Sequence, residues 1–192
     1  MRIEVCGAIA SGKTSIAKVL QSEVLGACLE NFQANPFWKP FYSEPGKHIF
    51  ETELTFLLQH YHNIKAFDSS HKHYVCDFSP TLDMAYARIG LIGSKLEAFE
   101  TIHKEVIKEV GWPDLLLHLS CGVGALLDRI NARARDVERN ISSEFLSALD
   151  AAIRSEVEAA RKHTRILFLD TERDNYLVDG LARKRLLTSL VN

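Results

Sequence analysis

The stretch that decides the fold lies near the amino terminus and reads Gly7-Ala8-Ile9-Ala10-Ser11-Gly12-Lys13-Thr14. It fits the pattern G-x-x-x-x-G-K-[S/T], follows an apolar strand-like run and opens a helical pattern. In such a loop the glycines permit a tight turn, and the backbone amides at the start of the helix face an anion. Lys13 is expected to reach the β- and γ-phosphates, and the Thr14 hydroxyl to ligate Mg²⁺. The predicted nucleoside triphosphate site consists of Gly7, Ala8, Ile9, Ala10, Ser11, Gly12, Lys13, Thr14 and Ser15.

Strand-like and helix-like runs alternate along the rest of the chain. This alternation predicts an α/β fold with a largely parallel sheet covered by helices on both faces. Arg2 and Glu4 give the first strand a polar alternation, which suits a central buried strand poorly. Gly26 is interpreted as the stop of the first helix, and the proline-interrupted segment 31–47 as irregular. The predicted strands are 2–6, 27–30, 74–77, 115–119 and 165–169, and the predicted helices are 13–25, 48–67, 79–92, 95–110, 123–132, 142–163 and 175–190.

Length and composition suit one globular domain. The chain has 192 residues, of which 46% are hydrophobic and 25% charged, and this excludes disorder, so residues 1–192 are expected to form a single domain. A formal charge of -2 lacks the basic excess typical of nucleic-acid binders. No apolar run approaches the roughly 18 residues that span a bilayer. With no targeting peptide evident and four separated cysteines interpreted as reduced thiols, we expect a cytoplasmic protein without nucleic-acid or membrane partners.

Two carboxylates end predicted strands at the same edge of the sheet as the phosphate loop. Glu30 ends the second strand, and Asp77 ends the third. Because ligands of open parallel sheets bind outside the carboxyl ends of the strands, both acids are expected near the γ-phosphate. One of them could accept a proton from an acceptor hydroxyl while the other holds hydrated Mg²⁺, and the residues alone leave this assignment open. The expected metal ligands are Thr14, Glu30 and Asp77.

An arginine-rich segment, residues 129–141, is the next candidate functional element. It contains Arg129, Arg133 and Arg135 within a charged run. Phosphoryl transfer depends mainly on positioning and on charge stabilisation, both of which arginine supplies. We therefore interpret this segment as a mobile cationic lid over the phosphate site.

Several of these motifs together resemble one family. Residues 30–37, Glu30-Asn31-Phe32-Gln33-Ala34-Asn35-Pro36-Phe37, are similar to the E-P-V-x-x-N-P-Y motif of deoxynucleoside kinases. Phe41-Tyr42 is similar to the F-Y pair of that family, and Asp77-Phe78-Ser79 to its D/E-R-S motif. The segment from Arg129 to Glu138 reproduces its lid pattern R-x-x-x-R-x-R-x-x-E. Over nearly its whole length the chain resembles the short bacterial members of this family, the deoxyadenosine and deoxyguanosine kinase-like ones.

The resemblance implies a fold, a reaction and a set of site residues. The fold is that of P-loop kinases, with five parallel strands in the order 2-3-1-4-5. The reaction is ATP- and Mg²⁺-dependent phosphorylation of the 5′-hydroxyl of a deoxynucleoside in nucleotide salvage, with Glu30 as the general base. Family members are commonly dimers, so a homodimer is implied without an identified interface. The implied catalytic residues are Glu30, Lys13, Arg129, Arg133, Arg135 and Asp77, and the implied nucleoside-binding residues are Glu30, Tyr42, Glu53, His60, Asp83 and Glu138.

The chain departs from the family pattern in the acceptor pocket. Phe78 stands in place of the arginine of D/E-R-S, and His60 in place of the arginine that pairs with the base-reading aspartate. Tyr86-Ala87 lies one residue short of the family's F-A pair. Glu53 replaces a base-reading glutamine, and an ionised carboxylate cannot donate a hydrogen bond. The preferred base is therefore not predicted.

Other classes of P-loop protein were weighed against this interpretation. A nucleoside monophosphate kinase would need additional cations in the acceptor pocket, whereas Phe78 and His60 replace arginines there. A GTPase would show N-K-x-D and D-x-x-G, and a transporter ATPase would show L-S-G-G-Q, and none of these motifs is present. A nucleotide-binding P-loop protein without activity stays open because of the missing arginines.

Overall fold

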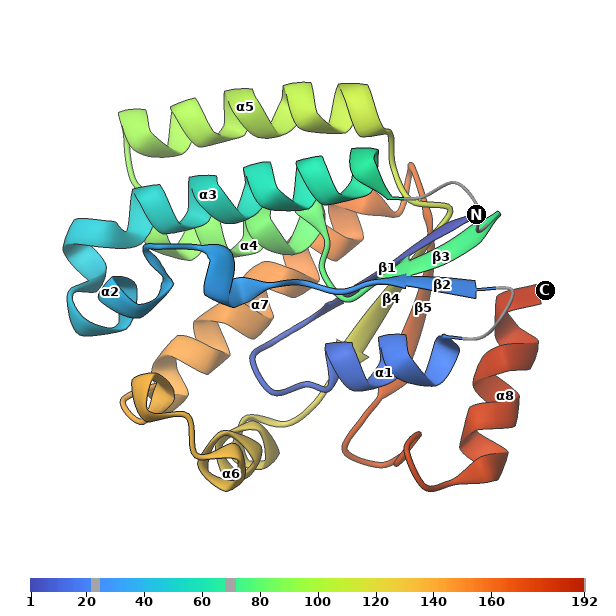
Figure 1. The fold of residues 1–192 in the computed structure, drawn as a ribbon. Coiled ribbons are helices and arrows are strands. Elements are labelled where there is room, and N and C mark those ends of the chain that lie inside the picture. The colour runs from blue at the N-terminus through green and yellow to red at the C-terminus, as the bar shows by residue number, and fades with distance from the viewer. Residues whose placement is uncertain (22–24, 68–71, 192) are drawn as a thin grey trace.

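Five parallel strands form one sheet in the order β2-β3-β1-β4-β5 (Figure 1), which confirms the predicted topology. The structure is a computed structural model that describes residues 1–21, 25–67 and 72–191. The last part of the predicted helix 13–25 lies outside these residues. The strands are β1 (Arg2–Gly7), β2 (Leu25–Cys28), β3 (His73–Cys76), β4 (Leu115–Ser120) and β5 (Arg165–Asp170).

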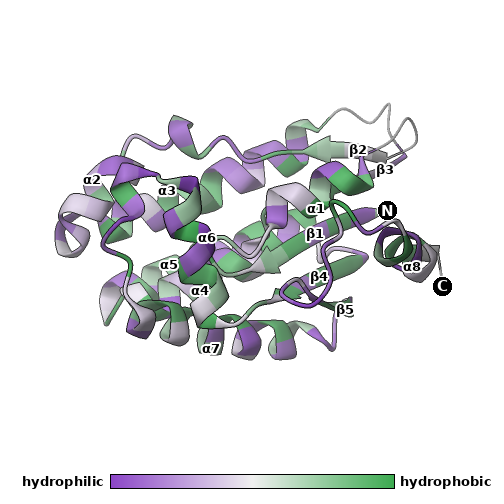
Figure 2. Ribbon diagram, turned by 90° about the horizontal axis from the view of Figure 1, so that it is seen from below, coloured by the Kyte–Doolittle hydropathy of each residue, from purple (hydrophilic) through white to green (hydrophobic). Residues whose placement is uncertain are grey.

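Helices cover both faces of the sheet, as the alternation of strands and helices predicted. On one face α1 and α8 pack against apolar side chains of β1, β4 and β5. On the other face α4, α6 and α7 do so, and α3 and α5 pack outside α4. Figure 2 shows β1 and β4, between these layers, in largely hydrophobic colours. The helices are α1 (Lys13–Leu20), α2 (Trp38–Ser43), α3 (Pro45–Ala66), α4 (Pro80–Gly90), α5 (Ser94–Val110), α6 (Val123–Arg133), α7 (Ser143–Ala160) and α8 (Gly180–Val191), with single 3₁₀ turns η1 (Phe32–Ala34) and η2 (Asp136–Glu138).

The segment 31–47, predicted to be irregular, is largely helical. It contains η1, α2 and the start of α3, which begins at Pro45 rather than at residue 48. A proline is well tolerated there because the first amides of a helix have no intrahelical partner. Asn35 fastens the segment to α3, since its side-chain amide donates to the Thr52 carbonyl and its carbonyl oxygen accepts from the Phe37 amide. The bond to Thr52 joins residues far apart in the sequence, so a local sequence pattern does not predict it.

Two predicted boundaries around the second and third strands are wrong. β2 ends at Cys28 rather than at Glu30, and Gly26, predicted to end the first helix, lies within β2 opposite Tyr74. The helix itself ends at Leu20, well before that glycine. β3 ends at Cys76, so Asp77 lies just beyond the strand. Both acids thus lie in the loops that follow the strands, at the edge of the sheet where ligands of such folds bind.

The last helix also starts later than predicted. α8 begins at Gly180 rather than at residue 175. The Asp179 carboxylate accepts hydrogen bonds from the amides of Leu181 and Ala182, which satisfies two of the first amides of the helix. This cap marks the start of α8.

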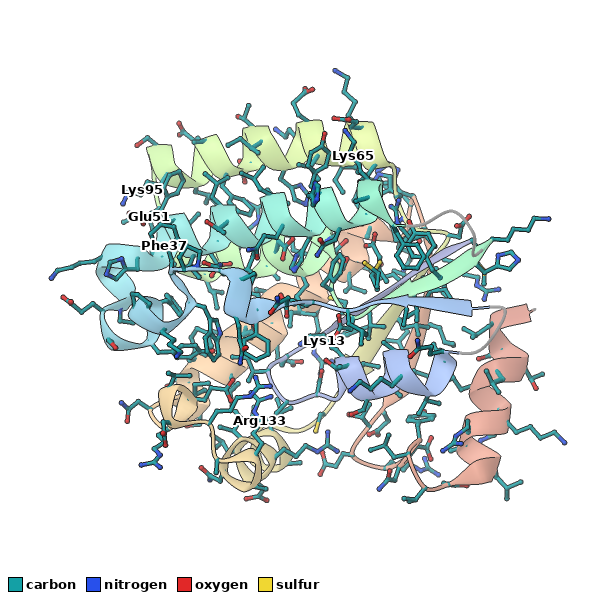
Figure 3. The ribbon with its side chains drawn as sticks, in the orientation of Figure 1. Lys13, Phe37, Glu51, Lys65, Lys95 and Arg133 are labelled. Atoms are coloured by element: carbon teal, nitrogen blue, oxygen red, sulfur yellow. The ribbon has the colours of Figure 1, made fainter. Side chains whose placement is uncertain are left out.

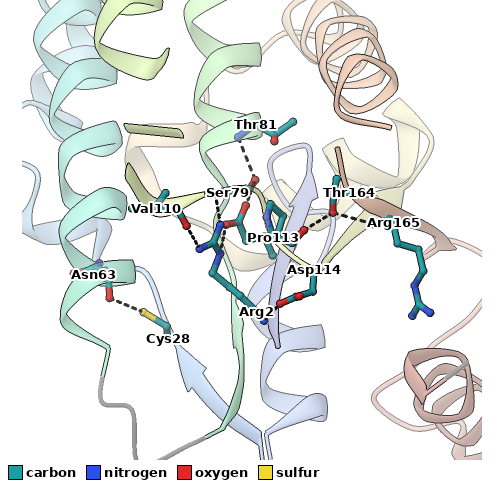
Figure 4. A network of polar contacts seen from close by, with 12 residues as sticks. Arg2, Cys28, Asn63, Ser79, Thr81, Val110, Pro113, Asp114, Thr164 and Arg165 are labelled. Atoms are coloured by element: carbon teal, nitrogen blue, oxygen red, sulfur yellow. Dashed lines mark hydrogen bonds and ion pairs between the residues drawn. The ribbon is translucent and has the colours of Figure 1, made fainter. Parts of the chain in front are cut away.

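The polar residues of β1 are compatible with a central strand because they pair with each other. The Arg2 Nε lies 2.9 Å from the Glu4 Oε1, and the Ser79 hydroxyl donates to the Glu4 Oε2 at 2.7 Å. The Arg2 guanidinium also donates to the carbonyls of Val110 and Gly111 (Figure 4). Glu4 is only 1% exposed, so these partners stabilise a carboxylate that would otherwise be costly to bury.

Two further expectations concern the cysteines and membranes. All four cysteines are free thiols, as predicted, and three of them are buried. In the described ranges no helix is long and apolar enough to cross a bilayer.

Candidate active site

The phosphate loop connects β1 to α1. Gly12 has a φ of +100°, in the left-handed region that favours glycine. Gly7 has no room for a side chain, because a Cβ there would lie 2.6 Å from the Ser11 Oγ. The Lys13 Nζ donates to the carbonyls of Gly7 and Ala8 at 2.9 and 3.2 Å, and burial lowers its pKa below the ordinary value. The loop therefore keeps its lysine folded back over the turn at the amino terminus of α1 (Figure 3).

Asp77 connects the phosphate loop to the loop after β2. One of its oxygens accepts from the Thr14 hydroxyl and the other from the Glu30 amide, each at 2.6 Å. Burial raises the pKa of Asp77 even though these hydrogen bonds oppose the shift. The structure thus brings together Thr14, Glu30 and Asp77, the three residues predicted to hold a metal.

This donor set fits hydrated Mg²⁺. Thr14, Glu30 and Asp77 supply only oxygen donors, and Mg²⁺ in kinases is usually held by one or two carboxylates together with substrate phosphates and waters. No group of three His, Cys, Asp or Glu side chains among the described residues could hold a metal by itself. The arrangement therefore suits an ion that the protein shares with a phosphorylated ligand.

His60 links two carboxylates inside the cleft. Its Nε2 lies 2.9 Å from the Glu30 Oε1, and its Nδ1 lies 2.9 Å from both oxygens of Asp83. The ring stacks on Phe78 with a centroid separation of 4.2 Å and an interplanar angle of 8°. Burial alone lowers the pKa of His60, but Asp83 and Glu30 raise it to about 10. The imidazole is therefore positively charged near neutral pH, and both of its nitrogens donate.

The charge of His60 keeps Glu30 ionised. Burial raises the pKa of Glu30, but the hydrogen bond and charge of His60, followed by the charge of Lys13, hold it below the ordinary value. A carboxylate that is ionised and faces the cleft can accept a proton.

Glu53 has the opposite protonation. It is 5% exposed, and burial together with the negative charge of Asp83 raises its pKa to about 8. A carboxyl group that is neutral at pH 7 can both donate and accept a hydrogen bond, as a glutamine does. The departure from the family's glutamine therefore leaves the hydrogen-bonding capacity of this position intact.

The predicted lid cations all line the cleft, and they are already paired. Arg129 donates to the Thr171 carbonyl at 2.5 Å and to the carbonyls of the phosphate loop. Arg133 and Arg135 both pair with Glu138, which is 2% exposed, and the Arg133 Nε to Glu138 Oε2 distance is 2.6 Å. The Arg135 guanidinium also lies 4.5 Å above the centre of the Phe32 ring. Part of the lid has regular secondary structure, since α6 extends to Arg133 and the 3₁₀ turn η2 follows.

A single cleft of about 470 Å³ is bordered by most of the predicted site residues. Its walls come from the phosphate loop, α3, α4 and the lid, with Lys13 and Arg133 among them (Figure 3). Of the predicted phosphate-site residues, Gly7, Ala8 and Ser11 do not line the cleft. The predicted residues that do are Ile9, Ala10, Gly12, Lys13, Thr14, Ser15, Glu30, Tyr42, Glu53, His60, Asp77, Asp83, Arg129, Arg133, Arg135 and Glu138.

Sequence reasoning missed part of the wall. Thr52, Phe56 and Leu82 also line the cleft, together with Tyr86. Phe56 lies three residues after Glu53 and four before His60, a helical spacing that could have revealed it. Three aromatic residues from the loop after β2 and from α2 are also present in the wall: Phe32, Trp38 and Phe41.

A five-stranded sheet of this order, with a phosphate loop after its central strand, is the fold of P-loop kinases, and this sets the class of the protein. The sequence profile of the family described as "Deoxynucleoside kinase" matches residues 3–192. The chain belongs to the deoxynucleoside kinase family and is a nucleoside kinase, as its motifs predicted.

Individual relatives agree with this family. The chain is 24% identical over 190 residues to a deoxyguanosine kinase of Bacillus subtilis (strain 168), covering 92% of this chain and 89% of that protein. It is 26% identical over 153 residues to a deoxyadenosine kinase of Dictyostelium discoideum, covering 77% of this chain and 62% of that protein. The solved structure of deoxyadenosine kinase from M. mycoides with bound dCTP superposes with a TM-score of 0.84 at 16% identity, covering 100% of this chain and 99% of that one. The same enzyme with bound dATP gives 0.78 at 17% identity over 100% of both chains, and at this identity both matches show the fold.

Proposed function

We propose that the chain transfers the γ-phosphoryl group of ATP to the 5′-hydroxyl of a deoxynucleoside in nucleotide salvage, with Glu30 as the general base. Phosphorylation of deoxynucleosides is the reaction of the family. The observation that carries the finer proposal is the ionised Glu30 carboxylate, which faces the cleft beside Asp77 and Thr14 at the phosphate loop.

Lys13 and the amides of the phosphate loop would bind the donor phosphates. Thr14, Asp77 and Glu30 would hold hydrated Mg²⁺, which neutralises charge on the donor phosphates when it is bound. Arg133 and Arg135 line the same cleft and would stabilise the charge that develops as the phosphoryl group moves. In this reaction the protein contributes mainly positioning and charge stabilisation rather than covalent chemistry.

Glu30 would orient the acceptor hydroxyl and accept its proton. The bond between the acceptor oxygen and the γ-phosphorus forms, the bond between that phosphorus and the bridging oxygen breaks, and ADP leaves. A hydroxyl is a weak nucleophile, so a carboxylate within hydrogen-bond reach contributes by taking its proton as the new bond forms.

The acceptor end of the cleft suits an uncharged nucleoside. Glu53 and Asp83 would face the base, and Tyr42 and Glu138 the sugar, with His60 in the same wall. The charge of His60 is already balanced by two carboxylates, Glu30 and Asp83. His60 therefore offers no free charge to a monophosphate acceptor, so a nucleoside monophosphate kinase is disfavoured. We also propose, from the family resemblance alone, a homodimer in the cytoplasm.

A panel of deoxy- and ribonucleosides with ATP and Mg²⁺, read by product formation, tests the reaction. Glu30→Gln tests the general base, because it keeps the shape and removes the basicity. We expect kcat to fall by about 10²–10⁴-fold, the range for a removed general base, with ATP affinity and melting temperature nearly unchanged. Absence of product with every nucleoside would refute the reaction. A Glu30→Gln variant with near-parental kcat would shift the base role to Asp77.

A further inference from the structure

His60 has no atom left with which to read a nucleobase. Both of its ring nitrogens are engaged at 2.9 Å, one by Asp83 and one by Glu30. Its ring also stacks against two aromatic rings, Phe78 at 4.2 Å and Phe56 at 5.9 Å between centroids. The residue is 3% exposed. A side chain held in this way cannot rotate toward a ligand without breaking contacts on every side.

The position of the Glu30 carboxylate, by contrast, depends on its hydrogen bond from His60. Glu30 lies in the loop after β2, where no ladder hydrogen bonds fix it, and its amide is tied to Asp77. Within residues 1–21, 25–67 and 72–191, His60 is the only side chain that donates a hydrogen bond to the Glu30 carboxylate. A glutamate has several rotatable bonds, so without that donor its carboxylate would sample several positions in the cleft.

We propose that His60 is a positioning residue that holds the Glu30 carboxylate against the acceptor hydroxyl, with Asp83 anchoring the imidazole from α4. The inference rests on the proposed function, in which Glu30 is the general base. Two elements of the fold then set the position of Glu30: His60 projects from α3 and Asp83 from the first turn of α4. The stacked Phe78 ring, which follows Asp77 directly, fixes the plane of the imidazole.

This role separates His60 from the base-reading function that the resemblance implies for its position. A base reader would change nucleoside affinity and the ranking of bases when it is altered. A positioning residue would change turnover for all nucleosides alike, because misplacement of a catalytic group by about 1 Å costs on the order of 10²-fold.

A double-mutant cycle distinguishes the two roles. His60→Gln, Glu30→Gln and the double variant are compared with the parent, measuring kcat and nucleoside KM across the panel. We expect His60→Gln to lower kcat by about 10²-fold with KM and the ranking of bases nearly unchanged. In the Glu30→Gln background the same substitution should cost less than about threefold, since residues that act through one another are not additive.

The possible failures are distinguishable. An equal loss of kcat in both backgrounds, or a raised KM with an altered ranking of bases, would overturn the positioning role of His60. Neither result would affect the general-base role of Glu30. Parental kcat in Glu30→Gln would overturn the general base and, with it, the role of His60.

Two further variants keep the test decisive. His103→Gln is the matched control: His103 is also buried and bonded to a backbone carbonyl, that of Pro80, but it lies outside the cleft. We expect it to lower the melting temperature and leave kcat unchanged.

If His60→Gln does not fold, Asp83→Asn removes the anchor of the imidazole at the other end. Its loss of kcat should likewise shrink in the Glu30→Gln background, and a loss of the same size in both backgrounds would overturn the proposal.

Discussion

Glu53→Gln should leave activity at pH 7 nearly unchanged and remove a loss of activity that the parent shows at pH 9. Burial, with the nearby charge of Asp83 and a smaller contribution from Glu30, raises the pKa of Glu53 to about 8, while the charge of His60 opposes the shift. The neutral, donating form therefore dominates below pH 8 and is lost above it. A glutamine donates at every pH.

The magnitude follows from that pKa. At pH 7, one unit below it, about nine tenths of the protein carries a neutral Glu53, and at pH 9 about one tenth does. For nucleosides whose base offers a ring nitrogen as acceptor, such as deoxyadenosine and deoxycytidine, the parent should lose about tenfold in kcat/KM through this group between pH 7 and 9. Other groups that titrate in this range act on both proteins, so the ratio of variant to parent isolates Glu53.

The assay is kcat/KM for both nucleosides at pH 7 and pH 9 in the parent and in Glu53→Gln. Glu51→Gln serves as the control, because Glu51 lies on the same helix but does not line the cleft. A constant ratio of variant to parent across this range would refute the role of the neutral carboxyl. A large loss in Glu53→Gln already at pH 7 would show that the ionised form is the functional one.

Two other predictions concern the lid and the core. Arg133→Ala or Arg135→Ala should lower kcat far more than nucleoside affinity, because their charge is needed mainly in the transition state, and parental kinetics would assign them to a solvated turn. His118 is 2% exposed, neither ring nitrogen has a hydrogen-bond partner among the described residues, and burial holds its pKa below the ordinary 6.5. Because a lowered pKa makes the folded state less stable as the pH falls below 6.5, His118→Leu should flatten the fall of the melting temperature below about pH 6.5. An unchanged slope would contradict this.

Features encoded in contiguous residues were predictable. The phosphate loop and the alternation of strands and helices depend on local patterns, and together with the family resemblance they led to the correct fold and strand order. The resemblance also assigned Glu30, Glu53 and Asp83 to one pocket, and the structure brings all three into one cleft.

Features that depend on contacts between residues far apart in the sequence were not predictable. The helical start of α3 and the turns before it are stabilised by Asn35 bonding to Thr52, which no local pattern signals. The simultaneous contact of His60 with Glu30 and Asp83 joins three segments of the chain. The protonation of Glu53 follows from its burial, which depends on how α3 packs.

The pairing of Glu138 with Arg133 and Arg135 has a consequence for which anions the site admits. The carboxylate is almost fully buried, so it acts as a built-in competitor for the two guanidinium groups. An arriving anion reaches these cations only by displacing the Glu138 carboxylate. The exchange is favourable only if the anion brings more negative charge and more acceptor oxygens than one carboxylate. Chloride and bicarbonate do not meet that condition, whereas a triphosphate chain does. We therefore expect the lid to stay shielded from chloride and bicarbonate and to exchange its partner only for phosphate-rich anions such as the donor.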